Sequence, residues 1–283
     1  MDGWITGVRV PFGRWMKSAI DYVQVWAGAP IDVFAGAMKR LIEGTAWLLI
    51  QPPATVSIIV FTTFVWWLHR RPGLAVYTAL SLLAIANFGY WEATMETVAL
   101  VGFATLLSVA IGVPIGIAAA HRPWFADVIR PVLDLMQTLP TFVYLIPTLV
   151  LFGLGVVPGL VSTVIFAVPA PIRLTQLGIA SVPVPLREAG EAFGATRRQL
   201  LWKVELPHAL PMIMTGVNQT IMLSLSMVVM AALVGAGGLG KPVVRALNTV
   251  NVAMGFEAGL AIVLVAILLD RVCKLPVRRR RAS

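Results

Sequence analysis

Charged residues are scarce in this sequence: Asp, Glu, Lys and Arg make up only 12% of the 283 residues, whereas 58% are hydrophobic. Soluble domains contain about a quarter charged residues. The composition therefore excludes an ordinary water-soluble enzyme or binding domain. Several stretches have no charge at all, and a membrane-spanning helix needs about 20 mainly apolar residues. We predict an all-α membrane protein with about seven transmembrane helices.

Cysteine and histidine are scarce as well. The single cysteine, Cys273, allows no disulfide within the chain, and we interpret it as a small buried hydrophobic residue. His69, His121 and His208 lie at the ends of spans without the spacing of metal ligands, so we interpret them as interfacial residues. The chain has no recognisable Ser/His/Asp set or carboxylate pair. The sequence thus predicts no metal, no cofactor and no catalytic residues.

The charge-free stretches indicate where the spans lie. Residues 135–172 are long enough to cross twice, and the segment from Gly153 to Gly159 breaks them in the middle, as glycine and proline do. The predicted spans are residues 44–68, 72–91, 97–120, the two halves of 135–172, 211–234 and 253–269. Charges avoid the middle of every span, where each costs about 2.5–3.5 kcal/mol. Ion-coupled carriers often accept that cost, so this pattern argues against a secondary transporter but leaves it open.

The positive charges lie in alternate loops. The net charge is +9, and the loops between the opposite ends of the spans hold only Lys241 and Arg245. The cation-rich loops and tail contain Arg70, Arg71, Arg122, Arg130, Arg187, Arg197, Arg198, Lys203 and Arg278 to Arg281. Because cytoplasmic loops are enriched in Lys and Arg, we predict an extracytoplasmic N-terminus and a cytoplasmic C-terminus. We prefer this interpretation of the positive charge to nucleic-acid binding.

The first 43 residues mix apolar and charged side chains. They lack the uninterrupted apolar core and cleavage site of a signal peptide. We predict an extracytoplasmic tail in which Ile5 to Trp26 form an amphipathic helix on the membrane surface. A partly ordered tail is the alternative.

A glycine-rich segment, Gly235 to Pro242, has the glycine and lysine spacing of a phosphate-binding loop. Such a loop needs a preceding strand and a following helix N-terminus, but here an apolar span precedes it. Pro242 also stands where a magnesium-binding hydroxyl belongs. We therefore predict a turn at the membrane boundary rather than a nucleotide site.

Two patterns inside the spans bear on packing and on a transport pathway. Gly112 and Gly116 form a small-xxx-small pattern, which permits close helix approach, with a kink at Pro114 as the alternative. Polar residues at membrane depth face protein or a water-filled path. A polar series in the sixth span therefore suggests a pathway or a subunit interface, with interhelical hydrogen bonding as the alternative; its members are Asn218, Gln219, Thr220, Ser224 and Ser226.

The segment between the fifth and sixth spans, residues 182–207, has explicit helix signals. Pro185 suits a first helical turn, and Gly194 is a natural C-terminal stop. Thr196 and Gln199 fit a capping box that opens a second helix, which we expect Pro207 to end. This helix–turn–helix fits a partner-docking element, a DNA-binding motif or a plain loop. We favour docking, because both ends run directly into membrane spans.

The same segment resembles the signature loop of ABC-importer permeases, which reads Glu-Ala-Ala, three residues, Gly, nine residues, Ile, one residue, Leu-Pro. The residues that match in register are Glu188, Ala189, Gly194, Leu206 and Pro207. Gly190 replaces the second alanine and costs about 1 kcal/mol of helix propensity, and Val204 replaces the isoleucine. Residues 134–147, 216–220, 225–229 and 237–240 resemble one subgroup, the glycine betaine/proline betaine/choline permeases.

The resemblance implies a type I importer permease fold in a bacterial inner membrane. It divides the chain into residues 1–43, the tail; 44–93, two accessory spans; 94–273, a five-helix core; and 274–283, a basic cytoplasmic tail. It also implies a cytoplasmic ATPase, an external substrate-binding protein, a second permease copy and no nucleic acid as partners. The ATPase groove would receive a coupling helix, whose residues are Glu188, Ala189, Gly190, Glu191, Ala192, Phe193 and Gly194, with Leu206 and Pro207 completing the loop.

The passing solute would be a quaternary ammonium compound, and hydrolysis would take place on the separate ATPase. The candidate pathway residues are Phe142, Tyr144, Asn218, Gln219 and Met222. The alternatives are an importer permease for another small solute, an ion-coupled secondary transporter and a membrane-anchored DNA-binding regulator.

Overall fold

The structure is a computed structural model that describes residues 11–274, and every regular element in this range is a helix. The all-α fold class is confirmed. In chain order the α-helices are α2 (Phe12–Ile50), α3 (Ala54–His69), α4 (Pro72–Asn87), α5 (Trp91–His121), α6 (Pro123–Thr138), α7 (Thr141–Phe152), α8 (Val156–Ala167), α9 (Pro169–Ala180), α10 (Val184–Ala192), α11 (Arg197–Leu200), α12 (Leu206–Leu233), α13 (Gly240–Asn248) and α14 (Val252–Cys273). A π-helix, η1 (Leu201–Glu205), joins α11 to α12.

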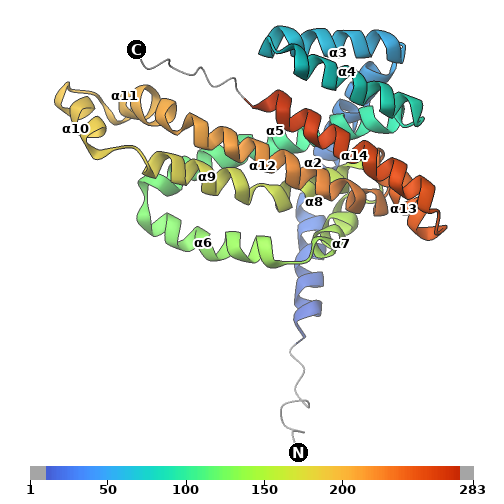
Figure 1. The fold of residues 1–283 in the computed structure, drawn as a ribbon. Helices are drawn as coiled ribbons and strands as arrows, with labels where there is room; N and C mark the ends of the chain where they lie inside the picture. Colours follow the sequence, from blue (N-terminus) through green and yellow to red (C-terminus); the bar gives the residue numbers. More distant parts are fainter. Residues whose placement is uncertain (1–10, 275–283) are drawn as a thin grey trace, which may run out of the picture.

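The centre of the molecule is a bundle in which α5, α9 and α12 pack against one another (Figure 1). A Cβ added at Gly112 would lie 2.6 Å from Pro171 Cγ, and one at Gly116 would lie 2.6 Å from the Ile172 carbonyl oxygen. The two glycines therefore let the backbones of α5 and α9 touch, which confirms the small-xxx-small interpretation. α5 remains one helix through Pro114.

The number of spans differs from the seven predicted. Among the described residues, four helices are long and apolar enough to cross a membrane, or up to six if each of two bent pairs counts as one span. The predicted continuous span 44–68 is wrong, because α2 and α3 meet at 100° across Pro52 and Pro53. Prolines lack the N–H that would continue the helix.

The double crossing predicted within residues 135–172 is partly right. The chain breaks at Gly153 and Gly155, which have φ of +70° and +140°, as expected for glycine. A second break was not predicted: α6 and α7 meet at 98° at Leu139 and Pro140. The amphipathic helix α6 begins before the charge-free stretch, at Pro123.

α2 crosses the boundary expected between the tail and the first span. Ile42 and Ala46 are buried in a cluster with Ala99 and Leu100 of α5. The N-terminal half exposes large apolar side chains, including Trp15 and Trp26, and projects away from the bundle (Figure 1). A helix is therefore present over the described part of the expected surface helix, but it is continuous with the following segment. Residues 5–10 of that prediction lie outside the described range.

The helices α3 and α4 form a hairpin beside the bundle. α4 contacts α14, and the His69 Nε2 atom lies 3.0 Å from the Val272 carbonyl oxygen. The short helices α10 and α11 lie at one end of the long helices, and α13 lies at the other end (Figure 1). This arrangement leaves the segment between α9 and α12 protruding from the bundle.

Candidate functional site

The first helix of the protruding segment ends at the glycine that the sequence indicates. Pro185 lies in the first turn of α10, and Gly194 has φ of +76°. The Gly194 N–H donates to the Glu191 carbonyl at 2.8 Å, and the Ala195 N–H donates to the Gly190 carbonyl at 3.1 Å. This is the Schellman pair of bonds, which requires a left-handed residue at the glycine position. The predicted stop is confirmed.

The second helix begins with the predicted capping box. The Gln199 N–H donates to Thr196 Oγ1 at 3.3 Å, and the Thr196 N–H donates to Gln199 Oε1 at 2.8 Å. Each residue satisfies a backbone donor of the other that has no partner within the helix. The start of α11 is thus fixed by contacts between Thr196 and Gln199, which are three residues apart.

Pro207 does not end the second helix, contrary to the prediction. The helix runs without a gap from Arg197 to Leu233. The five π-helical residues of η1 precede Pro207, and the Leu206 N–H donates to the Leu201 carbonyl. The bond that Pro207 cannot make therefore falls where the hydrogen bonding changes from π to α, so no continuous α ladder is broken.

The outward face of α10 is apolar and acidic. Glu188, Ala189, Glu191 and Ala192 are exposed, and Phe193 is 92% exposed. A phenylalanine in that position is poorly suited to water and well suited to a partner surface. Of the two remaining predicted residues at the end of the segment, Leu206 is half-buried and Pro207 is exposed.

Gly190 lies on the inward face of α10. A Cβ at this position would come within 2.8 Å of Leu200 Cδ1 and 3.7 Å of Val204 Cγ2. The glycine that departs from the signature pattern thus permits close contact with the second helix.

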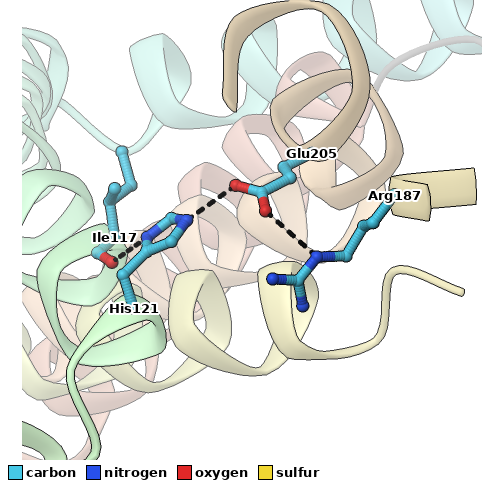
Figure 2. A network of polar contacts seen from close by, with 4 residues as sticks. All are labelled: Ile117, His121, Arg187 and Glu205. Carbon is cyan, nitrogen blue, oxygen red and sulfur yellow. Dashed lines mark hydrogen bonds and ion pairs between the residues drawn. The ribbon is translucent and has the colours of Figure 1, made fainter. Parts of the chain in front are cut away.

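A buried carboxylate joins α10 to the bundle, as Figure 2 shows. Glu205 is only 1% exposed. Its Oε1 atom lies 3.5 Å from Arg187 Nε on α10, and its Oε2 atom lies 2.8 Å from His121 Nε2 at the end of α5. The His121 Nδ1 atom lies 2.9 Å from the Ile117 carbonyl oxygen. One side chain therefore contacts both α10 and the end of α5, which lies 84 positions away in the sequence.

The hydrogen-bond partners constrain the protons in this network. A carbonyl oxygen only accepts, so Nδ1 of His121 donates to Ile117. The hydrogen bond between His121 Nε2 and Glu205 Oε2 then needs a second proton, which lies either on Nε2 of an imidazolium or on the carboxyl group of Glu205. Arg187 supplies a further positive charge beside the carboxylate. Buried charges are tolerated when they are paired and hydrogen-bonded in this way.

Sequence reasoning missed this network. His121 was interpreted as interfacial, and its partner Glu205 lies 84 positions further along the chain. The one available signal was the placement of Glu205 in the apolar series of Leu201, Ala209 and Ile213, which pack in one cluster. A carboxylate on such a face needs a cationic partner.

The sequence comparisons agree with this geometry. Residues 112–281 match the family described as the binding-protein-dependent transport system inner membrane component. This chain belongs to that family.

Individual relatives of this inner membrane component cover almost the whole chain. The glycine betaine transport system permease protein OpuAB of Bacillus subtilis is 44% identical over 93% of this chain and 93% of its own length. The glycine betaine/proline betaine permease ProW of Escherichia coli is 45% identical over 96% of this chain and 77% of its own. The glycine betaine/carnitine permease GbuB of Listeria monocytogenes is 42% identical over 93% and 94%.

A solved structure supports the fold of this permease. An inward-facing form of the MetNI methionine ABC transporter superposes with a TM-score of 0.56 at 24% identity, covering 63% of this chain and 93% of its own. At that identity the likeness concerns the fold alone. The predicted type I importer permease fold is confirmed, and the chain is a multi-pass membrane transporter subunit.

The five candidate pathway residues of the permease do not surround one cavity. Tyr144 is buried against the Phe166 ring, with its hydroxyl donating to the Met136 carbonyl, whereas Phe142 is 55% exposed. Asn218 lines a cavity of about 1160 Å³ between the α3–α4 hairpin and the helices α12 and α14. The candidate pathway residues therefore lie in different surroundings within this chain.

The polar series of α12 also divides into two sides. Thr220 and Ser224 are fully buried, and the Thr220 hydroxyl donates to the Gly216 carbonyl at 2.8 Å. Gln219, Met222 and Ser226 are exposed along the opposite face of the helix. The exposed face of α12 is not covered by the described part of this chain.

The glycine-rich segment is a turn, as predicted. No strand precedes it within residues 11–274. The Gly238 N–H donates to Glu96 Oε2 at 2.5 Å, and the Leu239 N–H donates to Thr97 Oγ1 at 2.8 Å. The backbone donors that a phosphate would need are therefore bonded to α5, which contradicts the nucleotide-site interpretation.

Proposed function

We propose that this permease forms the translocation pathway of an ATP-driven importer for quaternary ammonium compounds such as glycine betaine, proline betaine or choline. The observation that supports ATP as the energy source is the protruding helix–turn–helix, in which the exposed Phe193 follows the exposed Glu188 and Glu191. The substrate class rests on the relatives named above, which are permeases for glycine betaine, proline betaine and carnitine.

The docking partner on α10 is a cytoplasmic ABC ATPase. Residues Glu188 to Gly194 form the coupling helix that enters a groove of the ATPase, and Leu206 and Pro207 connect it to α12. The permease itself hydrolyses nothing. Closure of two ATPase subunits would move α10 and change which side of the membrane the pathway faces, a rigid-body switch between two states.

The second partner is another copy of the permease. The exposed face of α12, with Gln219 and Met222, suits a pathway shared by two chains. Phe142 and Tyr144 remain weaker candidates, because they lie on α7 and not on that face. Asn218 lies one turn before Met222 on α12 and lines the cavity next to α3 and α4. An extracytoplasmic substrate-binding protein delivers the solute at the opposite end, as the family description implies.

In this proposal the C-terminus lies in the cytoplasm and the N-terminus lies outside. The Glu205 contacts hold the end of α5, next to Arg122, beside α10. Two cation-rich loops therefore meet at one end of the bundle, as the positive-inside rule requires. Residues 94–273 act as the five-helix core, and the segments before it act as an accessory scaffold. Thiol labelling of single-cysteine variants in intact cells would reverse this assignment if an exposed position on α10 reacted with an impermeant reagent.

Uptake into proteoliposomes tests the energy source. Purified permease, ATPase and loaded binding protein should take up glycine betaine only when ATP reaches the ATPase side, with ATP hydrolysis accelerated by the loaded binding protein. Uptake that follows a proton or sodium gradient without the ATPase would establish the ion-coupled alternative. Binding of each candidate solute to the isolated binding protein identifies the substrate within the class.

Glu188 provides a separate test of the coupling helix. Glu188→Ala should abolish ATP-driven uptake while leaving membrane insertion and yield unchanged, because the side chain is exposed on α10. Normal uptake by this variant would contradict the assignment.

A further inference from the structure

The coupling helix is held to the rest of the protein by few contacts. No residue of α10 is buried, and only Arg187 and Gly190 are half-buried. Gly190 lies against Leu200 within the same protruding segment. Arg187 is the residue of α10 that makes an ionic contact with Glu205, the last residue before α12.

The partner of Arg187 is placed to pass a displacement onward. Glu205 belongs to η1, which leads directly into α12, and its second oxygen bonds His121 at the end of α5. α12 and α5 are both central helices of the bundle (Figure 1). Arg187, Glu205 and His121 in Figure 2 thus connect α10 with two helices of the bundle, α12 and α5.

The local backbone also points to a functional role. Five π-helical residues lie between the docking segment and α12 and end at Glu205. Such π segments inside α-helices are rare and recur at functional sites. A π turn changes the register of side chains around the helix, and here it ends at the residue that carries the buried carboxylate.

We infer that Glu205 is a positioning residue that transmits the movement of α10 to α5 and α12, through Arg187 on one side and His121 on the other. The inference rests on the proposed docking of an ATPase on α10. Without the two contacts, ATPase closure would move α10 while the bundle stays in place. Hydrolysis would then continue without uptake.

The test measures solute taken up per ATP hydrolysed in proteoliposomes with loaded binding protein. Glu205→Gln should keep ATPase association and hydrolysis, whereas uptake per ATP should fall about ten- to hundredfold, as expected for an equilibrium that loses a charge-assisted hydrogen bond. Asp270→Asn is the matched control, since Asp270 pairs with Lys274 at the same end of the bundle without contacting α10. The control should retain the wild-type ratio.

Single and double variants separate a relay from two independent structural contacts. Arg187→Gln and His121→Gln alter partly exposed side chains, so they remain informative if Glu205→Gln fails to fold. In a relay, breaking either link uncouples the system, and the double variant is no worse than the poorer single variant. Arg187→Lys should restore part of the ratio. Multiplicative losses in the double variant, or unchanged ratios in both single variants, would overturn the inference.

The proposed function can fail separately. If the wild-type complex shows no hydrolysis stimulated by the binding protein, the ATP-driven assignment is wrong. If wild type is coupled and Glu205→Gln has the same uptake per ATP, only the relay is wrong.

Discussion

The turn at Gly194 allows a quantitative test of how the coupling helix is held. Gly194 has φ of +76°, and a Cβ at this position would meet no atom within 4 Å. A substitution is therefore strained by the backbone alone and not by crowding within the chain. The left-handed conformation costs an L-residue about 1–2 kcal/mol, which changes the ratio of native to altered turn by a factor of about 5–30. Asparagine adopts this conformation more readily than other non-glycine residues.

The expected order of ATPase affinity is wild type, Gly194→Asn, Gly194→Ala, then Gly194→Val, which is β-branched. The weakest-binding variant should lose ATPase affinity by up to about 30-fold, because the apparent affinity scales with the fraction of permease whose turn is in the binding-competent conformation. Titration of labelled ATPase into detergent-purified permease measures this order. Asparagine is larger than alanine, so an order that follows side-chain volume, with Asn weaker than Ala, would refute the backbone argument. It would indicate contact between this position and the ATPase.

Three further variants test packing, docking and capping. Gly116→Ala should lower the thermal unfolding temperature by forcing α5 away from α9, at a cost of about 1–3 kcal/mol. Gly102→Ala in the same helix, where the space around the glycine is open, should be neutral or stabilising, and equal shifts in the two variants would contradict close packing at Gly116. Phe193→Ala should weaken ATPase binding about ten- to hundredfold, because it loses the free energy gained by burying a phenylalanine side chain. Unchanged affinity in the same titration would exclude Phe193 from the interface. Thr196→Ala removes a capping bond worth about 1 kcal/mol and should speed amide hydrogen exchange in α11, with no change elsewhere; unaltered exchange would show that the cap is dispensable.

The docking element was predictable because its determinants are local. The turn at Gly194 and the cap of Thr196 with Gln199 each depend on residues a few positions apart, and all of these contacts are present. The close approach at Gly112 and Gly116 was predictable for the same reason, since both glycines lie on one face of one helix. Hydrophobicity likewise located most of the long helices.

The features that sequence reasoning missed depend on tertiary context. Pro207 continues a helix because a π segment precedes it, and nothing in the residue types of Leu201 to Glu205 signals that segment. The contact between His121 and Glu205 requires α5 and α12 to be placed first. The length of the charge-free stretch indicated a span at residues 44–68, but it did not predict that the chain turns by 100° at Pro52 and Pro53.

The candidate pathway shows a different limit. Polarity at membrane depth marks Asn218, Gln219 and Ser224 alike, yet they face different surroundings in the structure. Asn218 lines a cavity, Gln219 is exposed and Ser224 is fully buried. Polarity and helical phase alone do not decide which of these positions is covered by the rest of the chain, because that depends on how the other helices pack against α12.

Cross-linking from the tip of the coupling helix tests most directly whether α10 is where the energy-supplying subunit binds. Phe193→Cys, in a chain whose native cysteine is changed by Cys273→Ser, should give an adduct with the mass of permease plus ATPase when the complex is treated with a short thiol cross-linker. Val250→Cys, 82% exposed in the turn between α13 and α14 at the other end of the bundle, should give none. An ATPase adduct at position 250 without one at position 193 would contradict the docking assignment.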